Sequence, residues 1–174
     1  MREFPEESYL AQYSFYSLIE KQYRYLRDQA LGPKHYSYVM EEVLRKNETN
    51  KKDLIRNLWM DNDCLSDLSK RGHVIGLHSY SHPTNLVALS LAQQHEEYGK
   101  NLKHIMRVTG SRPTTMAHPV NSYGRGTLRI LKELGIKLGF RSNMEFVQHD
   151  GLEHPREDVA NLLTSKNPED RRIG

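Results

Sequence analysis

Three short apolar runs limit what this chain can fold into. They are HVIGLH at residues 73–78, TTMAHP at 114–119 and IKLGF at 136–140. Short runs of this kind, bounded by turn residues, are typical of strands buried in a parallel sheet. We therefore expect parallel strands near residues 73–78, 114–118 and 136–141.

Helical patterns separate these runs. Ser90 and Gln93 form a capping box that opens a helix extending to Gly110, and a second helix is expected from Thr127 to Leu134. The order strand, helix, strand, helix, strand with short links implies right-handed crossovers and an α/β fold. The first of these helices is expected to bury Leu91, Tyr98, Leu102, Ile105 and Met106.

The first 71 residues have a different, helical pattern. Apolar residues recur at helical spacing over residues 6–30, 36–44 and 53–70, and Gly32 with Pro33 predicts a stop after the first of these. A chain of 174 residues is the size of one domain. We expect a single domain over 1–174, with a helical N-terminal region (1–71), an α/β core (72–145) and an irregular tail (146–174).

Composition narrows the classes of function. The formal charge is +3, from 25 basic and 22 acidic residues spread along the chain, so no basic patch predicts nucleic acid as a partner. No apolar run approaches a membrane span, and the charged N-terminus does not resemble a signal peptide, so the chain as given is expected to be cytoplasmic. A hydrophobic share of 37% with a mean hydropathy of −0.76 leaves open a core completed by another chain, as in a homo-oligomer.

His78 and His82 lie four residues apart, directly behind the first predicted strand. In open α/β folds ligands collect at the carboxyl ends of the strands, so both imidazoles are candidate metal ligands. The alternative is structural, with His78 donating to a backbone carbonyl and His82 lying in a turn. A catalytic zinc also needs a third protein ligand, and the nearest upstream acids, Asp61 and Asp63, are expected to be solvated.

Two longer stretches resemble a known family. LSKRGHVIGLHSYSHP (68–83) is similar to the second motif of the polysaccharide deacetylases, carbohydrate esterases of the chitooligosaccharide deacetylase type, and SRPTTMAHPVNSYGRGTLRILKELGIKLGFRS (111–142) is similar to their third. The resemblance implies an incomplete (β/α) barrel that binds a divalent metal, zinc first of all. The implied reaction is hydrolysis of N-acetyl or O-acetyl groups on an acetylated carbohydrate.

The resemblance also assigns roles to individual residues. His78 and His82 would be the imidazole ligands of the metal, and Arg112 would hold the catalytic carboxylate in place. His118 stands where the family has a tyrosine whose backbone N–H helps to bind the oxyanion. Val120 and Asn121 replace the aromatic residue and glycine of the family's loop.

The family's first motif is missing. It carries two adjacent aspartates, a general base and the third metal ligand, and this chain has no Asp-Asp pair. The family's general acid belongs to a Leu-His-Asp motif near the end of the domain. His149 and Asp150 match the last two residues of that motif, but they follow the third motif too closely to be assigned to it. We therefore expect a truncated member that is weak or inactive by itself. Two alternatives remain: a non-catalytic carbohydrate-binding or assembly module on this scaffold, and a helical interaction protein with structural histidines.

Overall fold

The computed structural model of the chain describes residues 4–11, 13, 15–145, 147, 151–157 and 159. The chain divides into two compact units, Met1–Trp59 and Met60–Gly174. Each unit is described by itself below. The expectation of one domain over 1–174 stays a prediction, and most of the predicted irregular tail lies outside the described residues.

The first unit is helical, as predicted, but its helices begin and end elsewhere. The elements are α1 (Leu18–Tyr25), a π-helical turn η1 (Leu26–Leu31), α2 (Gly32–Lys46) and α3 (Lys51–Leu58). The helix predicted from residue 6 begins only at Leu18, because Ser17 and Glu20 form a capping box there. Tyr9, which lies within the range predicted as helix, instead packs edge-on against Tyr25, with ring centroids 5.3 Å apart.

The helix predicted over 53–70 is two helices, α3 and α4 (Asn62–Lys70). Asp61 separates them: its Oδ1 accepts a hydrogen bond of 2.8 Å from the backbone N–H of Cys64, which caps α4. The same hydrogen bond lowers the pKa of the Asp61 carboxyl. A side chain that satisfies a helix N-terminus explains why the apolar periodicity is interrupted at this point.

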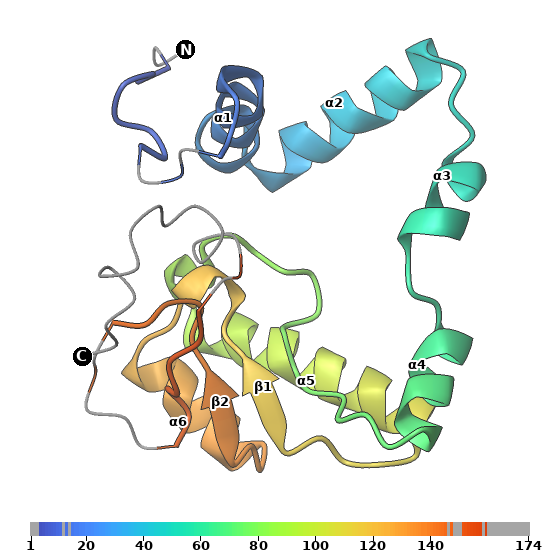
Figure 1. Cartoon of the computed structure of the whole chain (residues 1–174), viewed down its shortest axis with the longest axis vertical. Helices are drawn as coiled ribbons and strands as arrows, with labels where there is room; N and C mark the ends of the chain where they lie inside the picture. The colour runs from blue at the N-terminus through green and yellow to red at the C-terminus, as the bar shows by residue number, and fades with distance from the viewer. Residues whose placement is uncertain are drawn as a thin grey trace. The chain divides into compact units, whose positions relative to one another are not determined.

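The second unit contains a small parallel sheet (Figure 1). Strand β1 (Thr115–Ala117) pairs with β2 (Leu138–Phe140) in parallel, with Met116 opposite Gly139. Single parallel bridges extend the sheet on both sides, from Leu77 to Met116 and from Phe140 to His154. The α/β class and the partial barrel-type sheet are thus confirmed, although the strand expected at 73–78 is reduced to one bridge at Leu77.

Two helices connect these strands and cover one face of the sheet. They are α5 (Leu91–Thr109) and α6 (Arg125–Glu133), and short 3-10 turns occur at η2 (Leu86–Ala88) and η3 (Pro119–Asn121). The predicted capping box of Ser90 and Gln93 is present at the start of α5. The core is an apolar cluster between sheet and helices: Leu77, Leu86, Tyr98, Leu102, Ile105, Met116, Ile130, Leu131, Ile136 and Leu152. Leu91 and Met106, expected in the core, are exposed.

The other face of the sheet is open in the described part of the chain. Side chains alternate across a strand, so Thr115, Ala117, Leu138 and Phe140 point away from the helices. Together with Val74, His78 and their neighbours they line a cavity of about 450 Å³. Val74 is 78% exposed there, so this side of the sheet has an apolar surface that the described residues do not cover.

Among the described residues, no helix combines the length and apolar character needed to cross a lipid bilayer.

Replacement by alanine at two glycines of this unit should have opposite effects on its stability. A Cβ at Gly139 would overlap the backbone carbonyl of Leu152, so Gly139→Ala should destabilise the unit by about 1–3 kcal/mol. A Cβ at Gly99, within α5, meets nothing within 4 Å, so Gly99→Ala should stabilise it by about 0.5–1 kcal/mol. Urea denaturation followed by circular dichroism measures both, and equal effects of the two variants would contradict this packing.

Candidate metal centre

His78 lies at the carboxyl edge of the sheet, one residue beyond the bridge at Leu77. The backbone N–H of Leu77 donates to Thr115 O at 2.9 Å, and Ala117 N–H donates to Leu77 O at 2.9 Å. The His78 ring then donates from Nδ1 to the carbonyl of Ala117 at 2.8 Å. This hydrogen bond fixes the neutral tautomer with its lone pair on Nε2, the form that binds a metal ion.

The ring of His82 lies beside that of His78. Their centroids are 4.8 Å apart, and the planes are inclined at 57°. The turn between them uses left-handed backbone at two non-glycine residues, Ser79 (φ 65°) and His82 (φ 53°). The Ser79 hydroxyl accepts a 3.1 Å hydrogen bond from the His82 N–H, which helps to hold this turn. Strained backbone of this kind is concentrated at functional sites.

Helix α5 holds the histidine loop (residues 78–82) in place. Asn101 Oδ1 accepts from the backbone N–H of His78 at 3.0 Å. The Glu97 carboxylate accepts from the N–H groups of Tyr80 and Ser81 at 3.1 and 2.8 Å, and from the Ser81 hydroxyl at 2.9 Å. Sequence reasoning missed both helix residues. Their signal was a pair of polar residues four apart on one helix face, which many surface helices also have.

His118 is a buried structural side chain at the end of β1. Its Nε2 donates to the carbonyl of Leu152 at 2.8 Å, and its ring stacks on Tyr123 with centroids 3.9 Å apart. Its backbone N–H, expected to bind an oxyanion, donates to Phe140 O at 2.8 Å. That amide therefore belongs to the sheet in this structure, because β2 lies directly beside it.

Burial also sets the charge of this region. Desolvation lowers the pKa of both His118 and His78, and the hydrogen bonds to Leu152 and Ala117 oppose that shift. Burial and a hydrogen bond to Glu153 raise the pKa of Tyr123 to about 12. At neutral pH the imidazoles of His118 and His78 are therefore neutral. For His78 this is the state that a metal ligand requires.

Arg112 lies away from the histidine pair. Its Nη2 donates to the carbonyl of Leu134 at 2.8 Å, at the C-terminal end of α6. Arg112 precedes β1, whereas His78 and His118 lie at the strand's other end, so the structure brings the two histidines together and leaves the arginine at the opposite edge. A cation beside the last carbonyls of a helix is stabilising in itself. The role that the resemblance gives to Arg112, holding a catalytic carboxylate, stays a prediction.

A third protein ligand for the metal is missing from the part of the chain that the structure describes. No group of three or more His, Cys, Asp or Glu side chains there could hold a metal ion. Asp61 caps α4 and Glu97 holds the loop. His149 and Asp150, the candidate late motif, lie outside the described residues. Within the described residues the histidine pair thus offers two candidate ligand positions for a metal ion.

The match to a family model identifies the class of this protein. The model of the polysaccharide deacetylases matches residues 32–139, well over half of the chain, so the chain belongs to the polysaccharide deacetylase family.

The chain is also similar to individual proteins. Protein YlxY of Bacillus subtilis (strain 168) is 27% identical over 100 residues, which cover 56% of this chain and 31% of that protein. The Streptococcus pyogenes deacetylase PplD, solved in complex with acetate, has a TM-score of 0.51 at 20% identity and shares the fold over 63% of this chain and 51% of its own. Wild-type BA3943 of Bacillus anthracis, described as a CE4 family pseudoenzyme, has a TM-score of 0.42 at 20% identity over 55% of this chain and 34% of its own. The chain therefore spans about a third of YlxY and half of PplD.

The neutral state of His118 predicts how stability depends on pH. Because its folded pKa lies below the unfolded value of 6.5, the unfolded state binds the proton more readily. The contribution is fully present above pH 6.5 and is lost as the pH falls through the folded pKa. His118→Phe, which keeps a ring against Tyr123 but does not titrate, should lose less stability than the parent between about pH 7.5 and pH 5 in urea titrations. Identical losses in the two proteins would contradict a buried neutral His118.

Proposed function

We propose that this chain carries the histidine part of a metal-dependent carbohydrate deacetylase site. His78 and His82 bind a divalent metal, with zinc as the first candidate. The substrate is an acetylated carbohydrate. The observation that carries the proposal is the His78 hydrogen bond from Nδ1 to Ala117 O, which leaves the lone pair of the ring on Nε2. The ring of His82 lies beside that of His78, with the two ring centroids 4.8 Å apart. The deacetylase activity named for PplD supports the reaction class.

A metal ion bound there would polarise an acetyl carbonyl and lower the pKa of a bound water. The chain's own residues supply orientation: Ala117 O fixes the tautomer of His78, while Asn101 and Glu97 fix the loop between the histidines. Hydrolysis also needs a base to take the proton from the water. No carboxylate in the described residues is placed to do this, so we propose that the chain by itself is a weak or inactive deacetylase.

A second candidate is a non-catalytic carbohydrate-binding or assembly module on the same scaffold. The observation that favours it is that Arg112 and the backbone N–H of His118 have other structural partners. The open apolar face of the sheet, with Val74 78% exposed, also favours association with further polypeptide, including a second copy of this chain. A cytoplasmic location stays a prediction.

The metal site is tested by zinc titration of purified variants. His78→Ala and His82→Ala should each weaken zinc binding at least about ten-fold, because each removes one of two protein ligands. His95→Ala is the matched control, since His95 is an exposed histidine of α5 outside the loop. Calorimetry in competition with a chelator gives the affinities. Equal affinity of parent and both loop variants would remove the site.

Catalysis is tested by acetate release from an N-acetylated chitooligosaccharide in the presence of zinc. A missing general base costs about 10²- to 10⁴-fold, so turnover should be slower than that of a complete deacetylase by at least this factor. Residual activity should disappear with a chelator and in His78→Ala. A rate equal to that of a complete enzyme would refute the incomplete site, and residual activity that survives chelation would refute the role of the metal.

A further inference from the structure

We propose that a basic pocket beside the histidine loop binds the negatively charged group of an acidic saccharide. The pocket has a volume of about 340 Å³ and is lined by Tyr80 together with Lys100, Lys103, His104 and Arg107. This proposal names the class of carbohydrate for the histidine site, and to that extent it rests on the proposed function. Binding of the saccharide itself needs neither metal nor catalysis.

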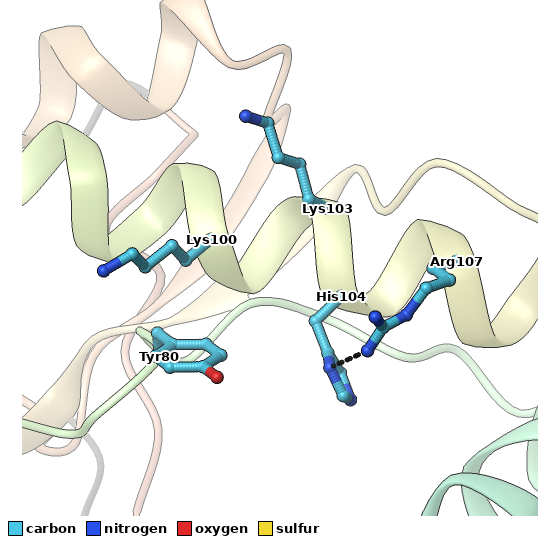
Figure 2. Close-up of a pocket in the computed structure, with 5 residues that line it drawn as sticks. All are labelled: Tyr80, Lys100, Lys103, His104 and Arg107. Carbon is cyan, nitrogen blue, oxygen red and sulfur yellow. Dashed lines mark hydrogen bonds between the residues drawn. The ribbon is translucent and has the colours of Figure 1, made fainter.

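The lining comes from two segments that are fixed to each other. Tyr80 belongs to the histidine loop, and its backbone N–H donates to Glu97 of α5 at 3.1 Å. The other four residues recur along two turns of α5, which at about 1.5 Å per residue gives a stripe about 10 Å long. Figure 2 shows Tyr80, His104 and Arg107 on the same side of this helix, whereas the ammonium group of Lys103 points away from Tyr80.

The groups around Tyr80 present hydrogen-bond donors. Arg107 Nη2 lies 3.1 Å from His104 Nδ1 and donates to it, so the neutral imidazole carries its proton on Nε2. The remaining guanidinium N–H groups, the His104 Nε2–H and the Lys100 ammonium are then all donors. Such a set matches a ligand with several acceptors and a negative charge, such as a carboxylate or a phosphate.

Charge balance supports an anion as well. Lys100 forms an exposed ion pair with Glu96 at 2.8 Å. Within the described part of the chain, Lys103 and Arg107 lie within ion-pair distance of no carboxylate, which leaves a net positive charge along this stripe. A cation with no carboxylate partner at the wall of a pocket gains most from an anionic ligand.

Tyr80 points to a sugar as the carrier of that anion. It lies midway between His78 and His82 in the sequence, is 57% exposed, and offers an aromatic face and a hydroxyl to a sugar ring. A saccharide whose acetyl group lies at the histidines would pass this ring and reach the basic stripe of α5. A nucleic acid fits less well, because the stripe is short and the rest of the chain has mixed charge with a total of only +3.

The probes are tri-galacturonic acid, which is acidic, and maltotriose, a neutral trisaccharide, each titrated calorimetrically into the full chain at low salt. We expect the acidic trisaccharide to bind at least about ten-fold more tightly, and added salt to weaken it. Arg107→Gln should reduce this binding at least about five-fold. Arg129→Gln is the matched control, since it removes a guanidinium from an exposed position of α6, and it should leave binding unchanged.

Further arms separate the other outcomes. Inorganic phosphate competing as well as the acidic trisaccharide would show a site for the anion alone and would overturn the role of the sugar. Tighter binding of a single-stranded oligonucleotide of equal charge would overturn the saccharide in favour of nucleic acid. Binding that persists with a chelator and in His78→Ala would support the pocket even if the metal site fails. Equal binding of the two trisaccharides, or by parent and Arg107→Gln, would refute the proposal.

Discussion

The parallel pairing of Leu77 with β1 is the constraint on which the histidine site depends. Two backbone hydrogen bonds join Leu77 to β1, from Leu77 N–H to Thr115 O and from Ala117 N–H to Leu77 O, and a third, from the ring of His78, ends on the Ala117 carbonyl. This carbonyl therefore orients the imidazole and selects its tautomer. A shift of the pairing by one residue would turn Leu77 out of the core and move His78 to the other face of the sheet. The candidate ligand is thus held by the sheet's register.

Helix α5 is the second part of the scaffold, and its different faces have different tasks. Tyr98 and Leu102 bury one face in the core, and Glu97 with Asn101 holds the histidine loop. The stripe that ends at Arg107 lines the basic pocket. A period of 3.6 residues permits this division, because residues one or two apart point in different directions. A change in the tilt of this helix would move the core, the loop and the pocket together.

The sequence predicted the α/β unit better than the helical one. Short buried runs and the capping box at Ser90 are local signals that tertiary contacts reinforce, and both are present. The helices predicted over 6–30 and 53–70 have wrong bounds, because the apolar spacing continues across the helix caps at Ser17 and Asp61. At these caps the side chains form hydrogen bonds with backbone N–H groups, so a new helix begins there. Among the site residues, the histidine pair was found through its position at a strand end, whereas Glu97 had no distinctive signal.

The sequence by itself determined the family, the parallel order of the buried runs and the presence of two imidazoles four residues apart, because motifs and spacing are properties of the chain. It also determined that an adjacent pair of aspartates is absent. Only the tertiary structure decided that Arg112 lies at the opposite edge of the sheet and that the His118 amide pairs with β2. Those outcomes depend on which end of a strand a residue occupies and on which neighbour accepts its hydrogen bond, and both follow from long-range pairing.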